Sequence, residues 1–260
     1  MKPHPISNPV CYPEFNNRVA LVTGARQGIG QALAQRLSCL GAVVIELDHG
    51  FTPEETGPQR FNIDVSDPVA VADVVALVES TFGDIEFAVS VAGILRLGSL
   101  LECSAADWHD SFAVNATGAF HVCQTIARRM ALRKRGSLVI VSSNAARIPR
   151  LNMGCYAASK AALSQFARCL ALELAQYHVR CNIVAPGATE TPMQKQLWNA
   201  HYGPAEVVRG DLEKHRIGIP LGSIAQVDDI ANTILFLLSS QSQHITMETI
   251  TIDGGATLGQ

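Results

Sequence analysis

The sequence has no long apolar run and no hydrophobic segment near its start. Its late apolar stretch, Ile234–Leu238, is far shorter than the roughly 20 residues that a membrane-spanning helix needs. Residues 1–17 carry prolines at positions 3, 5, 9 and 13 instead of the hydrophobic region of a secretory signal. The sequence therefore predicts neither a membrane span nor secretion, and we expect a cytoplasmic protein.

An excess of basic charge is also absent. Twenty Lys and Arg residues stand against 23 Asp and Glu residues, which gives a formal net charge of −3 and no electrostatic footprint for nucleic acid. The seven cysteines include no C-x-x-C pair and no metal-ligand spacing. We expect no nucleic-acid partner, no metal, and reduced thiols that mostly fill the core, Cys155 among them.

What the sequence does contain is a regular alternation of strand-like and helix-like segments. Short apolar runs predict strands at 18–24, 42–48, 85–91, 136–143, 179–185 and 245–252. Apolar residues at helical spacing predict helices at 28–40, 67–82, 106–133, 156–177 and 228–238. The alternation predicts an α/β fold, a single Rossmann-type doubly wound parallel sheet with helices on both faces, which binds ligands beyond the carboxyl ends of its strands.

A glycine-rich turn joins the first predicted strand to the first predicted helix. Glycines in such a turn let the backbone approach a pyrophosphate, and the helix N-terminus offers free N–H groups and a positive dipole end. The turn predicts a dinucleotide site, since a strand precedes it, a helix follows it and an acid ends the next strand. The candidate residues of this turn are Gly24, Arg26, Gln27, Gly28, Ile29 and Gly30.

Asp48, which ends the second predicted strand, bears on the choice of nucleotide. A carboxylate there can accept hydrogen bonds from the adenosine ribose and would repel a 2′-phosphate, so NAD is favoured over NADP. Arg26 is a counter-signal, because a basic residue in the glycine turn could meet that phosphate. Asp64 and Val65 could frame the adenine, although a turn role for Asp64 is nearly as plausible.

Tyr156 and Lys160 are four residues apart on a predicted helix and therefore share one face. A free tyrosine, with a pKa of about 10, is a poor base at neutral pH, but a neighbouring ammonium would stabilise its phenolate. Ser143 ends a predicted strand at the ligand edge and could hold a reacting hydroxyl. Asn115 could anchor a water that passes protons to Lys160. These four residues predict a proton-transfer site.

These motifs resemble the short-chain dehydrogenase/reductase family over about residues 18–257. The matching pieces are TGARQGIG at 23–30, Asp48, Asp64-Val65, Ala92-Gly93, Asn115, Ser143, Tyr156-x-x-x-Lys160 and Pro186-Gly187. The resemblance implies that the four proton-transfer residues are a catalytic tetrad, that Ala92, Gly93, Pro186 and Gly187 border the cofactor, and that helices 106–133 and 156–177 pack across the interface of a homotetramer or homodimer. One departure is Ser90-Val91, where the family usually has two asparagines, which leaves open how those positions tie the sheet.

With this resemblance the chain divides into an N-terminal extension, residues 1–16, and one dinucleotide-binding catalytic domain, residues 17–260. Residues 1–16 are rich in proline and predict a loose extension. The stretch at about 190–216 is the longest one between predicted helices and strands, and it predicts a partly helical lid over a substrate.

Several loops carry a closer resemblance within the family, to enzymes that use NAD to oxidise a cyclic dihydrodiol bearing a carboxylate. The segments that carry it include AGILRLG at 92–98, the stretch 147–163, TPMQKQLW at 191–198 and GIPLG at 218–222. A substrate carboxylate needs a cation or several hydrogen-bond donors. We therefore expect the substrate site at Ser143, Arg96, Arg147, Arg150, Met193 and Gln194, while a solvated charge for each arginine and core packing for Met193 stay open.

Two rival functions remain at this point. One is an NADPH-dependent ketoreductase of the 3-oxoacyl thioester type, against which Asp48 and the arginines argue. The other is a nucleotide-binding sensor that has lost catalysis, which the complete set around Tyr156 disfavours, because an idle site has no need of it.

Overall fold

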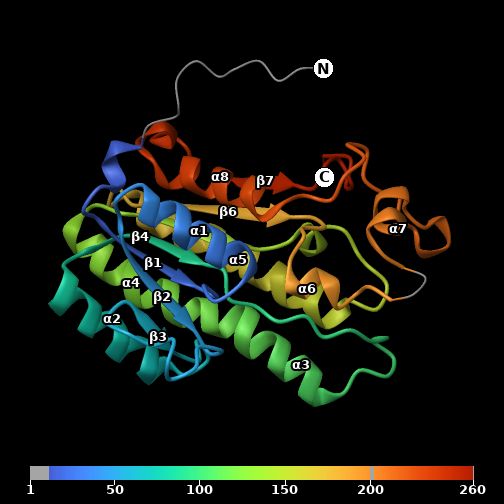
Figure 1. Ribbon diagram of the computed structural model, residues 1–260, viewed down its shortest axis with the longest axis horizontal. Coiled ribbons are helices and arrows are strands. Elements are labelled where there is room, and N and C mark those ends of the chain that lie inside the picture. The colour runs from blue at the N-terminus through green and yellow to red at the C-terminus, as the bar shows by residue number, and fades with distance from the viewer. Residues whose placement is uncertain (1–11, 200–201, 260) are drawn as a thin grey trace.

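The computed structural model describes residues 12–199 and 202–259 and has one parallel seven-stranded sheet (Figure 1). Its strands run in the order β3-β2-β1-β4-β5-β6-β7, and every pairing is parallel. The predicted α/β sheet is confirmed. The strands are β1 (Val19–Thr23), β2 (Val43–Asp48), β3 (Arg60–Asn62), β4 (Ile85–Ser90), β5 (Ser137–Val141), β6 (Arg180–Pro186) and β7 (Thr249–Ile252).

Helices cover both faces of this sheet and give the molecule three layers (Figure 1). One face carries α2 (Pro68–Phe82), α4 (Ala119–Arg133) and α5 (Gly154–Ala175), and the other carries α1 (Gly28–Cys39) and α8 (Val227–Leu238). The shorter helices are α3 (Ala105–Phe112), α6 (Pro192–Lys195) and α7 (Pro204–Arg209).

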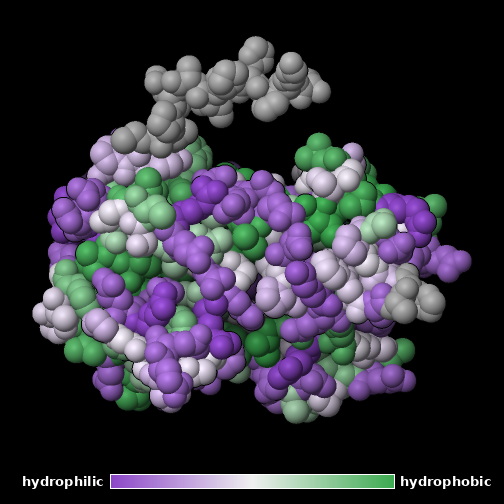
Figure 2. Space-filling model, in the orientation of Figure 1, coloured by the Kyte–Doolittle hydropathy of each residue, from purple (hydrophilic) through white to green (hydrophobic). Residues whose placement is uncertain are grey.

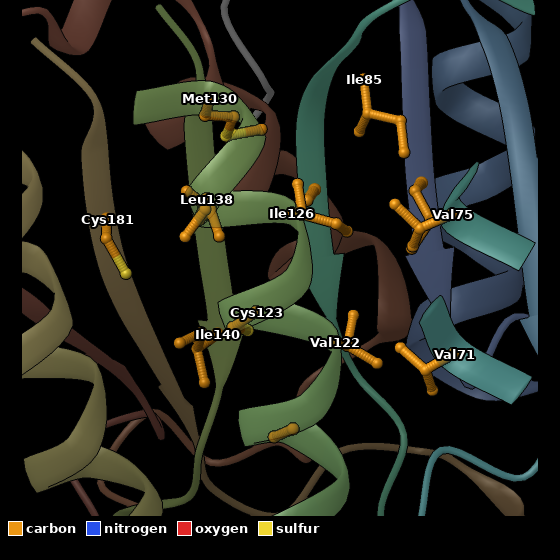
Figure 3. Close-up of a cluster of buried hydrophobic side chains, with 14 of the residues drawn as sticks. Val71, Val75, Ile85, Val122, Cys123, Ile126, Met130, Leu138, Ile140 and Cys181 are labelled. Carbon is orange, nitrogen blue, oxygen red and sulfur yellow. The ribbon is translucent and has the colours of Figure 1, made fainter. Parts of the chain in front are cut away.

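The alternation of side chains along each strand divides the core into two clusters. In β1, Val19 and Leu21 belong to one cluster while Ala20 and Val22 belong to the other, because successive side chains point to opposite faces. Figure 3 shows the first cluster, in which side chains of α2 and α4 meet those of β4, β5 and β6. Burial on both faces explains why the central strands β1 and β5 are almost wholly apolar, whereas the edge strand β3 carries Arg60 and Asn62.

Some large apolar side chains nevertheless remain on the surface, among them Leu101, Leu132 and Leu172. The face in Figure 2 is mostly hydrophilic, with hydrophobic residues in separate patches. No helix among the described residues is both long and apolar enough to cross a bilayer.

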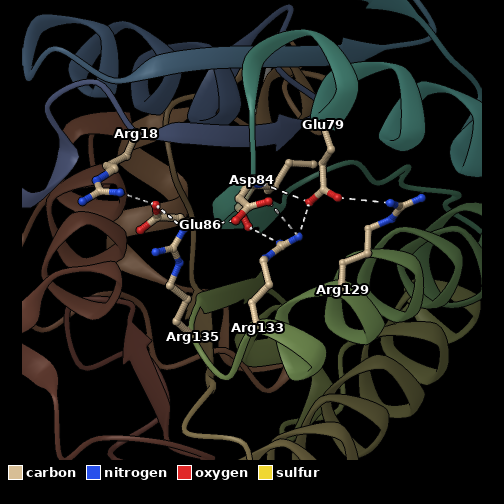
Figure 4. Close-up of polar contacts among 8 residues, drawn as sticks. Arg18, Glu79, Asp84, Glu86, Arg129, Arg133 and Arg135 are labelled. Atoms are coloured by element: carbon tan, nitrogen blue, oxygen red, sulfur yellow. Dashed lines mark hydrogen bonds and ion pairs between the residues drawn. The ribbon is translucent and has the colours of Figure 1, made fainter.

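The strand order reverses direction between β1 and β4, and this reversal positions the candidate site. Chain connections from β1 and from β4 leave toward opposite sides of the sheet, so a crevice opens beyond their carboxyl ends. The opposite edge is closed by ion pairs in which Arg133 and Arg135 contact Asp84, Glu79 and Glu86 (Figure 4). Both arginines are thus paired with acids.

The helix predicted at 106–133 contains a feature that the sequence does not reveal. Between α3 and α4 the chain forms a π-helical segment, η2 (Ala113–Gly118), which has a wider turn than an α-helix. Such π segments often occur at functional sites, and this one carries Asn115. Hydrophobic spacing is too coarse to distinguish a single wide turn from regular helix.

Residues 12–16, the described part of the predicted N-terminal extension, pack against the domain. Residues 1–11 lie outside the described residues, but η1 (Pro13–Phe15) is a turn of 3-10 helix. Phe15 is fully buried, with its ring 4.8 Å from that of Phe87, and Glu14 accepts hydrogen bonds from Ser240. The Phe15 ring and the Glu14 carboxylate therefore hold the described start of the chain against the domain.

Candidate active site

A cavity of about 520 Å³ lies at the carboxyl edge of the sheet. It is walled by the segments that follow strands β1 to β6, as expected for a parallel sheet of this kind. Of the residues selected from the sequence, those that line it are Gly24, Gln27, Gly28, Ile29, Asp48, Asp64, Val65, Ala92, Gly93, Arg96, Ser143, Arg150, Tyr156, Lys160, Pro186, Gly187, Met193 and Gln194. Four others, Arg26, Gly30, Asn115 and Arg147, do not.

The glycine turn needs its glycines for close backbone contact. Gly24 has a φ of +65°, and a Cβ there would sit 2.8 Å from the backbone nitrogen of Ala92. A Cβ on Gly30 would collide with the carbonyl oxygen of Gly24, so Gly30 serves to pack α1 against the turn. The packing directs the start of α1 into the cavity, where its free N–H groups can hold a pyrophosphate.

Asp48 faces the cavity from the end of β2 and is held by the backbone around it. Its carboxylate accepts hydrogen bonds from the amides of Arg26 at 3.1 Å and Gly50 at 2.8 Å. The Arg26 guanidinium points elsewhere, to Glu55 at 3.0 Å. A carboxylate at the cavity wall and an arginine that is already paired together favour ribose hydroxyls over a 2′-phosphate.

Thr23 links the ends of two strands at the positions Ser90-Val91, where the family usually has two asparagines. Its Oγ1 accepts hydrogen bonds from the amides of Val91 and Ala92, both at 3.1 Å. The hydroxyl thus joins the ends of β1 and β4 without an asparagine. Farther along the wall, Asp64 accepts hydrogen bonds from Ser66, and these lower the pKa of its carboxyl group.

Ser143, Tyr156 and Lys160 come together at the centre of the cavity. The three side chains are all buried, and the Lys160 Nζ lies 5.9 Å from the centre of the Tyr156 ring. Burial raises the pKa of Tyr156, while a hydrogen bond with Ser143 acts to lower it. The Lys160 ammonium donates to the carbonyl oxygen of Val141 at 2.9 Å, which fixes the side chain beneath the ring.

Asn115 lies behind this cluster, fully buried, and does not open on the cavity. Its Oδ1 accepts from the Ile94 amide at 2.8 Å, and its Nδ2 donates to the Ile94 carbonyl and to Ser159 Oγ, each at 3.0 Å. The π-helical turn thereby holds the loop after β4 against α5. A water anchored by Asn115 stays a prediction, since its amide is engaged with protein groups on both atoms.

Replacing Lys160 by Met is expected to change the pH dependence of stability with a definite sign. Burial lowers the pKa of Lys160 from its usual 10.5 to about 8, so between these values the folded chain binds fewer protons than the unfolded one. The free energy of unfolding of the wild type should therefore rise relative to the variant as pH increases through this window, by about 3 kcal/mol in total.

Urea unfolding of both proteins at about pH 7 and about pH 10 measures this difference. Loss of the hydrogen bond to Val141 changes stability equally at both pH values, so it cancels. A difference between the two proteins that does not change with pH would contradict the burial of an ionisable Lys160.

The arginines expected from the sequence differ in their positions. Arg150 is half-buried and lines the cavity. Arg96 also lines it, but its guanidinium is paired with Asp110 at 3.2 Å on the exposed side. The expectation for Arg147 is corrected, because its side chain is exposed and outside the cavity lining. Arg147 directly follows the turn η3 (Asn144–Ala146) as its C-cap residue.

Arg216 is a cavity residue that the sequence motifs did not reveal. Its Nη1 donates to the Tyr202 hydroxyl at 3.1 Å and its Nη2 to the weakly accepting sulfur of Met153 at 3.6 Å. Its Nε is buried and has no hydrogen-bond partner among the described residues. A guanidinium with such poor acceptors, facing a cavity, is suited to bind an anion.

The positive charge of Arg216 also affects the pKa of Arg150. Burial lowers the pKa of Arg150, and the charge of Arg216 lowers it further. Asp253 and Tyr202 act in the opposite direction on Arg150. A substrate carboxylate beside Arg150 and Arg216 would be attracted by both positive charges. The one sequence signal for Arg216 is its place at the end of the long stretch predicted as a lid, at about 190–216.

Comparison with known proteins agrees with this geometry. Residues 24–257 match the family model described as enoyl-(acyl carrier protein) reductase. A solved structure of an aldohexose dehydrogenase from Thermoplasma acidophilum superposes with a TM-score of 0.82 at 28% identity, covering 95% of this chain and 96% of that one. The chain belongs to the short-chain dehydrogenase/reductase family.

Two curated relatives in this family share one name. The 2,3-dihydro-2,3-dihydroxybenzoate dehydrogenase of Bacillus subtilis (strain 168) is 43% identical over 255 residues, covering 94% of this chain and 98% of the relative. The enzyme of that name from Escherichia coli (strain K12) is 42% identical over 246 residues, covering 95% and 99%. The similarity therefore spans both the nucleotide half and the substrate half of the cavity.

Proposed function

We propose that this short-chain dehydrogenase/reductase oxidises 2,3-dihydro-2,3-dihydroxybenzoate to 2,3-dihydroxybenzoate with NAD, in the biosynthesis of a catecholate siderophore. The observation that carries the proposal is that one cavity joins Tyr156 and Lys160 to a pair of arginines, Arg150 and Arg216. The first pair fits proton transfer from a hydroxyl, and the second pair fits a carboxylate on the same small molecule. The names of the two curated relatives support this substrate.

The residues of the nucleotide half fit NAD. The start of α1 would hold the pyrophosphate, Asp48 the adenosine ribose, and Asp64 with Val65 the adenine. Ala92, Gly93, Pro186 and Gly187 would border the rest of the nucleotide. NAD, when bound, accepts a hydride from the substrate carbon.

The protein groups would handle the proton that leaves with this hydride. Ser143 holds the reacting hydroxyl by a hydrogen bond, and Tyr156 as the phenolate accepts its proton. The Lys160 ammonium stabilises the phenolate through its charge, across a distance of 5.9 Å to the ring centre. Asn115 is proposed as the fourth member, which positions the loop after β4 through Ile94.

The chemistry of the substrate sets the direction of the reaction. Oxidation of one hydroxyl-bearing carbon of the cyclohexadiene gives a ketone, which tautomerises to an aromatic catechol. Aromatisation makes oxidation strongly favourable, so the protein has no need to stabilise the product. Oxidation is therefore the physiological direction in this proposal.

We propose that the segment at about 190–216 acts as a lid over the substrate half of the cavity. Met193 and Gln194 of α6 line the cavity, as do Tyr202 and Arg216. The carboxylate would bind Arg216 and so draw the lid onto the ring. Arg96 lies near the same end, whereas Arg147, exposed and outside the lining, is not part of the proposal.

Assembly and location complete the proposal. We propose a cytoplasmic homotetramer whose interfaces include α4 and α5. Three large apolar side chains on these helices support this, because Phe120, Leu132 and Leu172 are exposed in the single chain. Sedimentation equilibrium tests it, and a monomer at micromolar concentration would contradict it.

The test of the function is stoichiometry. Each NADH formed from the dihydrodiol carboxylate should be matched by one 2,3-dihydroxybenzoate, followed by its catechol fluorescence. A ketoreductase of the 3-oxoacyl thioester type would instead consume NADPH with an acyl thioester. A non-catalytic sensor would bind NADH and turn over neither substrate.

Asp48→Asn is expected to weaken the preference for NAD over NADP by at least about tenfold in kcat/KM, because it removes a negative charge beside the 2′ position. Steady-state rates with both nucleotides measure the ratio. Asp64→Asn is the matched control, since a change near the adenine affects both nucleotides alike. An unchanged ratio in Asp48→Asn would remove this residue from the choice of nucleotide.

A further inference from the structure

Two cysteines that the proposed reaction does not use lie in contact beside the site. The Sγ atoms of Cys103 and Cys155 are 2.7 Å apart, although the residues are 52 positions apart in the chain. Cys103 belongs to the loop between β4 and α3, and Cys155 to the first turn of α5. Cys103 is partly exposed and Cys155 is buried. The sulfur pair therefore bridges two separate segments of the fold.

Backbone contacts hold these two segments together. The Gly98 amide donates to the carbonyl of Asn152 at 3.0 Å, and Gly98 forms a bridge with Met153. The side chain of Leu100 lies so close to Gly154 that a Cβ there would collide with it. The closeness of the sulfurs thus follows from the folded backbone, rather than from two mobile side chains that happen to meet.

The other described cysteines have no such arrangement. Cys39 and Cys169 are exposed, and Cys123 and Cys181 are buried in the core. Burial raises the pKa of Cys123 to about 12 and that of Cys181 still further, so neither thiol ionises at neutral pH. Among the described residues, the sulfur-to-sulfur contact is confined to Cys103 and Cys155.

The two thiols of the pair differ in how they can react. Burial and the neighbouring Cys103 raise the pKa of Cys155 to about 11, which keeps it a protonated thiol. Cys103 is the sulfur that solvent can reach. An oxidant therefore meets Cys103 first, and Cys155 stands in contact as the resolving thiol.

We propose that Cys103 and Cys155 form a reversible disulfide that slows turnover under oxidising conditions. With hydrogen peroxide, the Cys103 thiolate attacks one oxygen, the O–O bond breaks, and the leaving hydroxide takes up a proton to become water. Cys103 is then a sulfenic acid. The Cys155 sulfur then attacks the Cys103 sulfur, the S–O bond breaks, and the proton of the Cys155 thiol passes to the departing hydroxyl to give a second water, so two thiols and one peroxide give one disulfide and two waters.

The bond would connect two walls of the active-site cavity. Leu95 and Arg96 of the loop line the cavity, as do Met153, just before α5, and Tyr156 in its first turn. A disulfide holds its sulfurs about 2.05 Å apart, so the pair has to approach by less than about 1 Å and the fold can accommodate it. The bond would tie the loop covalently to α5 and would restrict the small movements of these cavity residues during substrate entry and product release.

Oxidation of the full-length protein with hydrogen peroxide, followed by peptide mapping under non-reducing conditions, tests the site. We expect a peptide pair linked through Cys103 and Cys155, a fall in kcat of at least fivefold, and full recovery after dithiothreitol. Cys103→Ser should keep its activity through the same treatment. Cys169→Ser, which removes an exposed cysteine elsewhere, is the matched control and should respond as the wild type does.

Either of two results would overturn the proposal. One is a map without the Cys103–Cys155 link, and the other is a linked protein with undiminished kcat. The peptide mapping does not depend on the substrate. The disulfide can therefore be absent while the proposed oxidation is correct, and it can be present while the proposed oxidation is wrong.

Discussion

Tyr156→Phe is expected to lower kcat for oxidation of the dihydrodiol carboxylate by about 10³-fold or more. The variant keeps the aromatic ring and loses only the hydroxyl that accepts the proton. Burial raises the pKa of Tyr156, so the phenolate forms only with the help of Lys160 and Ser143, and no other described residue of the cluster can replace it. Affinity for NADH should change little, because the glycine turn and Asp48 lie on the other half of the cavity.

Single-turnover formation of NADH and fluorescence titration with NADH separate these two effects. Tyr177→Phe is the matched control, because Tyr177 is exposed at the far end of α5. The sign of the pH dependence gives a second readout. Proton acceptance requires the phenolate, so kcat/KM for oxidation in the wild type should rise with pH from neutral. Retention of most activity in Tyr156→Phe would refute the assignment.

Arg150→Met and Arg216→Met are each expected to raise KM for the carboxylated diol by about 10- to 100-fold. Each variant removes a charge-assisted hydrogen bond to the carboxylate, worth about 1.5–3 kcal/mol. The effect should disappear with a dihydrodiol that lacks the carboxylate. In the double variant, KM should rise by less than the product of the two single increases. The reason is that the charge of Arg216 acts on Arg150 in the free protein, so the two changes are coupled.

The exposed Arg147 provides the control for this pair. Arg147→Met removes the same charge from the same stretch of chain without altering the cavity. Steady-state kinetics on both diols, with the dissociation constant of 2,3-dihydroxybenzoate as a second readout, distinguish binding from chemistry. An equal loss on both diols would contradict the carboxylate role of Arg150 and Arg216.

The nucleotide half of the site was predictable because its signals are local. Apolar runs define the strands, and the glycine turn, Asp48 and Ser143 each follow directly from a strand end. Tyr156 and Lys160 are one helical turn apart, so their meeting requires only that α5 forms. Parallel strands then bring all of these residues to one edge without further information.

The substrate half depends on loop conformation, which spacing does not encode. Arg147 and Arg150 are three residues apart, yet the turn at η3 leaves one outside the cavity and one inside it. Arg216 lies 66 positions from Arg150 in the chain, and its place beside the cavity, with its guanidinium on the Tyr202 hydroxyl, depends on how the stretch after β6 folds. The π-helical turn at Asn115 and the contact of Cys103 with Cys155 likewise arise from tertiary packing.

In the proposed function, one cavity couples hydride removal to recognition of a carboxylate. Comparing NADH formation from a cyclic dihydrodiol with and without its ring carboxylate tests this coupling. We expect a kcat/KM at least about 10²-fold higher for the carboxylated diol with NAD, since Arg150 and Arg216 both line the cavity. Equal rates on both diols would contradict it.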